Sequence, residues 1–403
     1  SAALHEPGAE GMIAVDDISG QRLDPALMMK ARREEIAYFK SMGVYDKVDI
    51  SECWTETGKA PIAVRWVDIN KGDSLNPLYR SRLVAKEFNT GVCPELYAAT
   101  PPSECLRLML SMLASGRRKG MGLMYADVSR AYFYAKAIRP VYVKLPDEDF
   151  DKGDEQRCGK LKMSMYGTRD AALNWSLEYG DTLRAANYVQ GRSNPCLFFK
   201  KDTGVAIMVH GDDFVAVGPE EHLAEARATL EDKYKLKVER LGCGEGQTTE
   251  LRILNKVVRI SKNGVELEAD PRHAELVVQE LDLKSAKASP VPGSKEEAKR
   301  PAAPPTTTPS RASRDRIAIE QNVDSIDEIK GKYPENEWDI AASDAVVAEG
   351  DEFEALLDSE AARLYRGVAA RLNYIAPDRP DISYAVKEAA RNMSAPTVSD
   401  MRR

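Results

Sequence analysis

Two adjacent carboxylates, Asp212 and Asp213, interrupt an apolar stretch at residues 205–218, VAIMVHGDDFVAVG. Apolar side chains alternate before them and resume after them, which predicts a β-hairpin with the His-Gly-Asp-Asp segment at or beside its turn. Carboxylate oxygens suit Mg²⁺, so the pair is a candidate metal site. The alternative is a surface turn without chemistry, because Asp and Gly are common in turns.

A third carboxylate favours the metal site. Asp127 lies at the end of an apolar strand predicted over residues 122–128. Three carboxylates at neighbouring strand ends could hold two divalent ions, Mg²⁺ or Mn²⁺. One ion would activate an attacking hydroxyl and the other would neutralise a leaving pyrophosphate. Without a cation the three carboxylates would repel one another.

The elements around these residues include a basic hairpin. Residues 64–69 and 78–88 read as two strands joined by a turn at 71–73. Arg80, Arg82 and Lys86 alternate along the second strand and put positive charge on it. A solvated strand face explains the same pattern equally well.

Helices and hairpins alternate along the rest of the chain. The spacing of apolar residues predicts helices that begin after Asp24-Pro25, at Ser103 and at Thr168, and further helices over 219–234, 270–283, 359–374 and 382–393. Asn263-Gly264 predicts a second hairpin, with strands over 250–261 and 265–269. Because several strands meet in hairpins, we expect an α+β fold with a mostly antiparallel sheet.

Composition sets the broad class. The 403 residues have a net charge of −7, which argues mildly against a simple nucleic-acid binder. Residues 61–218 nevertheless hold 22 basic against 18 acidic residues, while 320–360 hold 14 acidic residues and 2 Lys, so a basic groove remains compatible with the sequence. Residues 289–313 are rich in Pro, Ala, Ser and Thr, which predicts a disordered linker.

The cellular location is predicted from three features that we looked for in the sequence: membrane-spanning runs, a signal peptide and paired cysteines. We find no apolar run of bilayer length and no signal peptide, so we expect no membrane association and no secretion. Six separate Cys without a CxxC pair predict neither a zinc site nor a disulfide framework, which fits an intracellular protein.

Five motifs occur in an order that resembles the reverse transcriptase of copia-type LTR retrotransposons: LVAKEF, YADVSRAYF, VYVKLP, LKMSMYGTRDAALNW and VHGDDFVAVG. The resemblance extends over about residues 24–402. It implies a palm-fingers-thumb fold and an RNA-directed DNA polymerase, a nucleotidyltransferase that forms part of a Pol polyprotein. Such an enzyme extends a primer on an RNA or DNA template with dNTPs and two Mg²⁺ or Mn²⁺ ions.

The resemblance also implies roles for single residues. Asp127 is similar to the first metal-binding Asp of the palm, and Asp212 and Asp213 to the pair of the Tyr-x-Asp-Asp box. Tyr132 matches an aromatic gate against the ribose 2′-OH, with a plain core aromatic as the alternative. The other implied nucleotide contacts are Tyr166 and Gly167 at the template and incoming base, and Arg80, Arg82 and Lys86 at the triphosphate.

The resemblance divides the chain into five regions: a loose lead-in (1–24), fingers and palm (25–218), a thumb-like region (219–288), a linker (289–358) and a helical connection (359–403) toward an RNase H domain that the chain lacks. Two motifs depart from the family. His210-Gly211 replaces Tyr-Val, and Thr168-Arg169-Asp170 replaces Leu-Lys-Gln, which leaves the second template-side contact open.

The alternative to an active polymerase is a degenerate or domesticated fragment, which keeps the fold, with or without nucleic-acid binding, and does not catalyse. The intact carboxylates favour the enzyme, whereas the acidic insert and the missing RNase H region favour the fragment. An active copy would work in a cytoplasmic virus-like particle or the nucleus, and the sequence leaves its oligomeric state open.

Overall fold

The computed structural model describes residues 14–73, 76–88, 94–116, 120–287 and 355–402, which fall into two compact units divided between Leu267 and Glu268. Helices and antiparallel sheets are mixed, as the α+β prediction requires. The boundary falls inside the region 219–288 that the resemblance assigns to a thumb. No helix in the described ranges is both long and apolar enough to cross a lipid bilayer.

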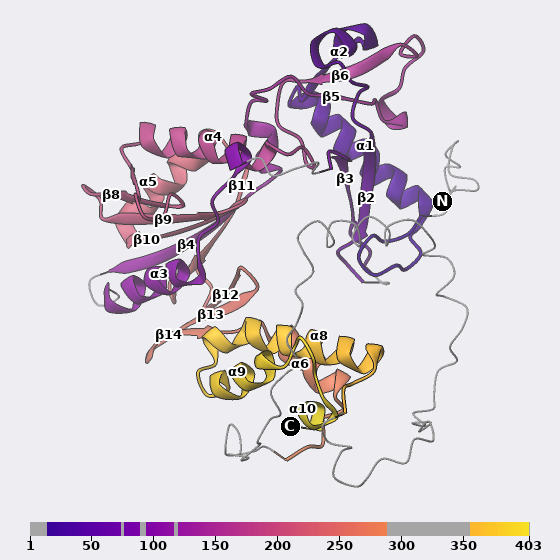
Figure 1. Ribbon diagram of the computed structural model, residues 1–403. Coiled ribbons are helices and arrows are strands. Elements are labelled where there is room, and N and C mark those ends of the chain that lie inside the picture. Colours follow the sequence, from indigo (N-terminus) through magenta and orange to yellow (C-terminus); the bar gives the residue numbers. More distant parts are fainter. Residues whose placement is uncertain (1–13, 74–75, 89–93, 117–119, 288–354, 403) are drawn as a thin grey trace, which may run out of the picture. The chain divides into compact units, whose positions relative to one another are not determined.

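A six-stranded antiparallel sheet organises the first unit (Figure 1). The predicted hairpin at 205–218 forms its centre, and both of its strands are buried along nearly their whole length. Burial on both faces explains why their sequences are continuously apolar. In spatial order the strands are β11 (Leu236–Leu241), β4 (Met121–Val128), β10 (Asp213–Pro219), β9 (Val205–His210), β8 (Leu197–Lys200) and β7 (Val189–Gln190).

Each face of this sheet has its own core. Helices α4 (Ala171–Ala185) and α5 (Glu220–Glu231) cover one face, and α3 (Ser103–Gly116) packs on the other (Figure 1). Trp175 and Phe214 are buried in the first core, while Leu113 and Val217 are buried in the second.

A small sheet of β12 (Glu250–Ile253), β13 (Lys256–Ser261) and β14 (Gly264–Glu268) adds to the α3 side. The prediction of one strand over 250–261 is wrong. The chain turns at Leu254 and Asn255, which have φ of 50° and 65°. The one local signal of this turn is Asn255, because Asn tolerates a left-handed backbone, whereas Leu rarely adopts it.

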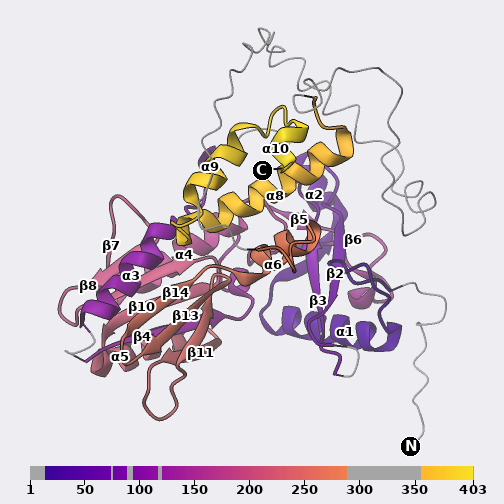
Figure 2. The ribbon, with the colours of Figure 1, turned by 90° about the horizontal axis from the view of Figure 1, so that it is seen from below.

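The remaining part of the first unit is built on α1 (Pro25–Ser41), which begins as predicted with Asp24 as N-cap and Pro25 at its first turn. Figure 2 shows α1 beside the hairpin of β2 (Val64–Asn70) and β3 (Tyr79–Ala85), which share a core with Phe39 and Leu83. Residues 14–24 are not loose, since Ala14 and Leu23 are buried beside this helix.

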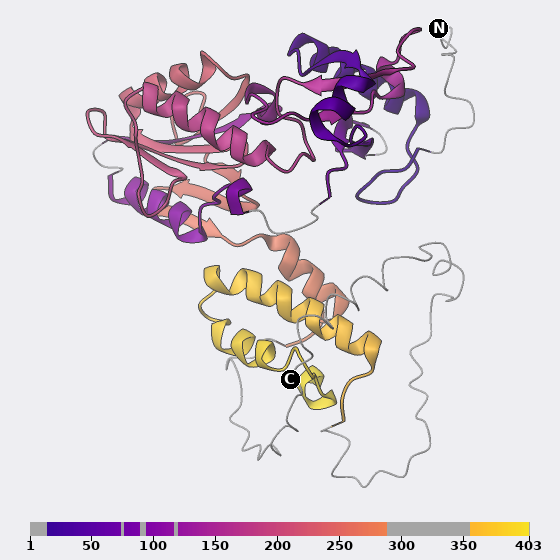
Figure 3. The same ribbon diagram turned by 45° about the horizontal axis from the view of Figure 1, so that its top comes forward.

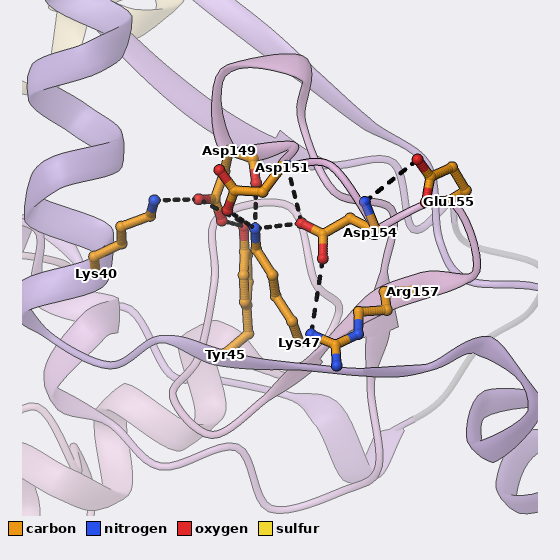
Figure 4. A network of polar contacts seen from close by, with 9 residues as sticks. Lys40, Tyr45, Lys47, Asp149, Asp151, Asp154, Glu155 and Arg157 are labelled. Carbon is orange, nitrogen blue, oxygen red and sulfur yellow. Dashed lines mark hydrogen bonds and ion pairs between the residues drawn. The ribbon is translucent and has the colours of Figure 1, made fainter.

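A polar network anchors the loop that precedes β6 (Arg157–Leu161). The Lys47 ammonium, on β1 (Tyr45–Asp49), lies 2.5 Å from a carboxylate oxygen of Asp154 and 2.8 Å from one of Asp151 (Figure 4). The Tyr45 hydroxyl donates to Asp149 at 2.5 Å. The loop is therefore held against a sheet formed by β1, β6 and β5 (Tyr142–Val143), with α2 (Ile50–Thr57) alongside.

The second unit is helical. Figure 3 shows α6 (Pro271–Glu280, orange) against the yellow helices of the C-terminal segment. These are α8 (Ser359–Ile375), α9 (Ser383–Arg391) and α10 (Val398–Arg402), of which the first two confirm predicted helices. The Tyr365 hydroxyl donates to the carbonyl oxygen of Ala389 at 2.8 Å and ties α8 to α9. The predicted linker at 289–358 lies almost wholly outside the described residues.

Candidate active site

The three carboxylates predicted to act together lie at one edge of the six-stranded sheet. Asp127 is near the end of β4, Asp213 begins β10, and the two are directly opposite in the antiparallel register. Asp212 lies in the turn before β10, and one carboxylate oxygen from each residue lies within 4.8 Å of the others. All three side chains are partly exposed, so a ligand can reach them from solvent.

The turn that carries Asp212 is held from two sides. Gly211 has a left-handed φ of 63°, which glycine adopts without steric cost. The indole Nε1 of Trp175 donates a hydrogen bond to the Gly211 carbonyl oxygen at 2.7 Å. The N–H of Val128 donates to the Asp212 carbonyl oxygen at 2.9 Å, which fixes the turn to the end of β4.

Tyr125 is a member of the site that the sequence did not suggest. It precedes Asp127 by two residues, so both side chains lie on the same face of β4. Its hydroxyl donates a hydrogen bond of 2.5 Å to Oδ1 of Asp213. Burial raises the pKa of Tyr125 well above its ordinary value, so the hydroxyl keeps its proton and remains a donor.

The carboxylates are crowded in a partly desolvated place. Burial raises the pKa of Asp127, the charge of Asp212 adds to this, and the charges of Arg80 and Lys71 oppose it. Burial likewise raises the pKa of Asp213, against the hydrogen bond from Tyr125. Such a set of oxygen donors fits a hard divalent cation, Mg²⁺ or Mn²⁺, which would relieve the repulsion.

Basic side chains on the β2–β3 hairpin face the carboxylates. Arg80 and Arg82 alternate with buried residues of β3 and thus share one face of the strand. Burial lowers the pKa of Lys71, and the charges of Arg80 and Arg82 lower it further, whereas Asp127 and Asp212 oppose this. Lys71, predicted only as a turn residue, therefore belongs to the same basic cluster. Lys86 lies one residue beyond β3 and is exposed.

Two aromatic rings in contact link the core of the hairpin to the core of the sheet. The guanidinium of Arg82 lies 4.8 Å from the ring centroid of Tyr166, and the ring centroids of Tyr166 and Tyr132 are also 4.8 Å apart. Burial raises the pKa of Tyr166 to about 12, against the charge of Arg82. Burial also raises the pKa of Tyr132, with a contribution from Asp212, and Tyr132 packs on the core shared with α4.

Gly167 permits this arrangement. Its φ is 82°, and a Cβ placed there would lie 2.1 Å from the carbonyl oxygen of Ala85. The close approach lets the Ala85 N–H donate to the Tyr166 carbonyl oxygen at 2.8 Å. Tyr166 and Gly167 are thereby fixed to the end of β3, next to the two arginines.

A sequence profile described as reverse transcriptase (RNA-dependent DNA polymerase) matches residues 45–246, half of the chain. The chain belongs to this reverse transcriptase family. The matched region contains the three carboxylates, the basic hairpin and the aromatic residues around them. The family assignment confirms the resemblance inferred from the motifs.

Relatives of this reverse transcriptase are retrotransposon polyproteins. It is 24% identical over 339 residues to the retrovirus-related Pol polyprotein from transposon TNT 1-94 of Nicotiana tabacum, which covers 79% of this chain and 24% of that protein. It is 26% identical over 164 residues to the Pol polyprotein from transposon RE1 of Arabidopsis thaliana, which covers 39% and 11% of the two chains. The chain thus spans about a quarter or less of these relatives.

Among solved structures, a telomerase from Candida albicans in complex with a fragment of telomeric RNA matches 68% of this chain and 57% of its own, at 8% identity and a TM-score of 0.37.

The segment that departs from the usual reverse transcriptase motif has an internal role here. Asp170 is buried and accepts hydrogen bonds from Arg139 at 3.0 Å and from the Asn174 amide at 3.1 Å. Glu87, just beyond β3, also contacts Arg139 at 2.5 Å. Asp170 therefore ties its segment to the hairpin instead of facing solvent.

Tyr125, Lys71 and Trp175 are the members of the site that sequence reasoning missed. Tyr125 carried one usable signal, its two-residue spacing from Asp127 on a strand. Lys71 and Trp175 carried none, because their places depend on how segments far apart in sequence come together.

Proposed function

We propose that this chain is the RNA-directed DNA polymerase of a copia-type retrotransposon, which extends a primer with dNTPs on an RNA or DNA template. The observation that carries the proposal is the cluster of Asp127, Asp212 and Asp213 opposite the basic face of the hairpin. Family membership and the Pol polyprotein relatives support it. We place the activity inside the cell, in a virus-like particle or the nucleus.

In this proposal the polymerase parts follow the described elements. The six-stranded sheet with α4 and α5 is the palm, and the hairpin of β2 and β3 with the neighbouring segment at 140–170 supplies the fingers. The chain beyond the palm, including the helices of the second unit, supplies the thumb and connection. Helix α5 and strand β11 belong to the palm, although the resemblance placed them in the thumb-like region.

The three carboxylates would hold two divalent ions, which activate the primer 3′-hydroxyl and neutralise the leaving pyrophosphate when bound. Tyr125 orients one of the ligands through its hydrogen bond to Asp213. Asp212 is placed by main-chain contacts on both sides of its turn. Little of the site has to reorganise during the reaction, which is what makes electrostatic stabilisation effective.

The basic and aromatic residues would bind the nucleotide. Arg80, Arg82 and Lys71 offer positive charge to a triphosphate, and guanidinium groups match its oxygens well. Tyr132 would lie beneath the sugar and exclude a 2′-oxygen by its volume. The neighbouring pair Tyr166-Gly167 would support the template and incoming base.

Primer extension tests the proposal directly. The full chain is incubated with an oligo(dT) primer on a poly(rA) template and dTTP, with Mg²⁺, with Mn²⁺ and with EDTA. We expect extension that requires the metal and disappears in Asp212→Asn. The control is Asp181→Asn, which changes an exposed carboxylate paired with Arg184 on α4.

If the parent chain extends no primer with either metal, the proposal is overturned in favour of a non-enzymatic descendant of a retroelement. If Asp212→Asn keeps the parental rate, the carboxylate cluster is not the active centre. A loss of activity in Asp181→Asn of the same size would point to a folding defect.

A further inference from the structure

The short segment between Asp127 and Tyr132 contains an unusual backbone. Arg130 has φ of 55° and ψ of 49°, a left-handed conformation that a long side chain adopts only rarely. It precedes a 3-10 turn over Ala131–Tyr134, which starts with a hydrogen bond of 3.0 Å from the Phe133 N–H to the Arg130 carbonyl oxygen. The conformation of Arg130 therefore sets where Tyr132 lies relative to Asp127.

Helix α1 holds Arg130 in this conformation. The Arg130 Nε donates a hydrogen bond of 2.7 Å to Oε2 of Glu35, whose side chain is only 2% exposed. The guanidinium also lies 4.1 Å from the ring centroid of Tyr38, one turn along the same helix. Oε1 of Glu35 is buried and has no hydrogen-bond partner among the described residues, so the direct contact with Arg130 balances this buried carboxylate, and the charge of Arg80 also acts on it.

The same helix contacts the residues on both sides of Tyr132 in the chain. Phe39 packs edge-on against Phe133 with ring centroids 4.9 Å apart, and the hydroxyl oxygens of Tyr38 and Tyr134 are 3.4 Å apart. Helix α1 lies at 25–41, outside the profile match of 45–246. Helix α1, which the family match does not include, thus contacts the turn that carries Tyr132.

We propose that Glu35 and Arg130 form a positioning pair that places Tyr132 and so sets the selectivity of the nucleotide site between deoxyribose and ribose. This inference rests on the proposed polymerase function. Its physical basis is that the carboxylate of Glu35 is buried, so an ion pair that balances it is costly to leave half-broken, unlike a pair between two exposed groups. Helix α1 then contributes to nucleotide selection by positioning Tyr132.

Three variants of the full chain test the pair. Glu35→Gln removes the charge and keeps the shape of the side chain. Arg130→Gly removes the guanidinium, and glycine adopts the left-handed backbone without strain. Because Arg130→Gly alone leaves a buried carboxylate unbalanced, the double variant Glu35→Gln/Arg130→Gly keeps the test valid if that single variant folds poorly.

The matched control is Arg32→Gln. Arg32 lies on the same helix and forms comparably buried ion pairs, at 2.6 Å with Asp68 and 3.0 Å with Glu148. These partners do not belong to the segment that carries Tyr132. The control therefore reports what the loss of a buried pair on α1 does to stability alone.

Two measurements are made on each variant. The first is hydrogen–deuterium exchange of peptides that cover residues 129–135, which does not depend on activity. The second is the ratio of kcat/KM for ribonucleotide to that for deoxyribonucleotide. We expect faster exchange and a ratio raised about tenfold in Glu35→Gln and in the double variant, since small misplacements of a positioning group change rates by up to about 100-fold. Arg32→Gln should change neither the exchange at residues 129–135 nor the ratio of the two kcat/KM values.

A further variant connects the pair to Tyr132 itself. Tyr132→Ala should raise the same ratio because it removes the ring beneath the sugar. Adding Glu35→Gln to Tyr132→Ala should raise it no further, because the two changes act on one group and cannot be additive. If the effects of the two substitutions on the ratio were fully additive, the proposal that Glu35 and Arg130 act through Tyr132 would be overturned.

Unchanged exchange at 129–135 in Glu35→Gln and in the double variant would overturn the positioning role whether or not the chain is active. Faster exchange with an unchanged ratio in an active variant would overturn the link to sugar selectivity. If the parent chain has no polymerase activity, the proposed function fails and the selectivity claim fails with it, whereas the exchange result still decides whether Glu35 and Arg130 hold the segment.

Discussion

At the scale of single residues, a few hydrogen bonds and close contacts hold the side chains of the site in place. Asp213 accepts a hydrogen bond from the Tyr125 hydroxyl, and the turn that carries Asp212 accepts one from the Trp175 indole. Gly167 allows a close backbone contact that any side chain would prevent. Each of these interactions can be removed by one substitution that keeps most of the surrounding shape.

Tyr125→Phe removes only the hydroxyl that orients Asp213. We expect the affinity for Mn²⁺ to fall by about 10- to 100-fold, the usual cost of losing a group that orients a metal ligand. Isothermal titration calorimetry with Mn²⁺ measures this without any turnover. The control is Tyr188→Phe, a buried tyrosine beside Lys200 on β8. Equal Mn²⁺ affinities in the two variants and the parent would show that the hydroxyl does not orient a metal ligand.

Gly167→Ala should displace the Tyr166 segment from β3. Its Cβ would lie 2.1 Å from the Ala85 carbonyl oxygen, and the left-handed φ adds a backbone cost of about 1–3 kcal/mol. Gly120→Ala is the matched control, since φ there is 77° and a Cβ would have nothing within 4 Å. Thermal unfolding should show a larger loss of stability for Gly167→Ala, and equal losses would mean that the contact with β3 relaxes freely.

At the scale of elements, cations on β1 and α1 determine how the loop before β6 is held. The hydrogen bond from Lys47 lowers the pKa of Asp154, and the Lys47 pKa is raised by its carboxylate partners against the effect of burial. A carboxyl with a lowered folded-state pKa stabilises the fold above its unfolded pKa, and this contribution is lost as the pH falls through the folded value. A cation with a raised pKa loses its contribution as the pH rises through its folded value.

Lys47→Met tests this network. It leaves the buried Asp154 without its nearest cation, whereas Asp149 keeps its ion pair with Lys40, so we expect Tm at pH 7 to fall by roughly 5 °C or more. The parent should lose stability steeply as the pH falls below about 4, the ordinary pKa of Asp, and the variant should lose less over that interval. Melting curves from pH 3 to pH 7 provide the comparison. Parallel pH profiles would rule out a linked contribution from this network.

At the scale of the whole molecule, the first unit has its own cores on both faces of its central sheet and around α1. A chain that ends at Leu267 should therefore unfold in one cooperative transition and keep the near-ultraviolet circular dichroism of its buried aromatic residues. A broad, non-cooperative melt of this shortened chain would show that the unit depends on the residues that follow.

The sequence predicted the parts of the fold that local patterns determine. The hairpin around Asp212, the capped start of α1 at Asp24 and helices α6, α8 and α9 of the second unit followed from periodicity, turns and caps. Strand β11 was missed although its first four residues alternate between apolar and charged and glycines follow at 242, 244 and 246. The turn at Leu254 and Asn255 was missed because Leu rarely adopts a left-handed backbone and Asn255 alone marks it.

The candidate site also contains residues that the sequence could predict and residues that it could not. The acidic residues could be predicted because three carboxylates in apolar strands have few structural explanations. Tyr125 carried a signal in its spacing from Asp127, whereas Lys71 and the pair of Glu35 with Arg130 could not be predicted, because their roles arise from contacts between segments far apart in sequence, about 95 residues for Glu35 and Arg130. Long-range register and helix packing leave no mark in a short window of sequence.

The second unit is assembled from two stretches of chain, 268–287 and 355–402, joined by the packing of α6 on α8 and the ion pair of Glu280 with Arg371. For protein engineering, an affinity tag or a fluorescent reporter inserted between the two stretches should therefore leave the contacts that join them intact.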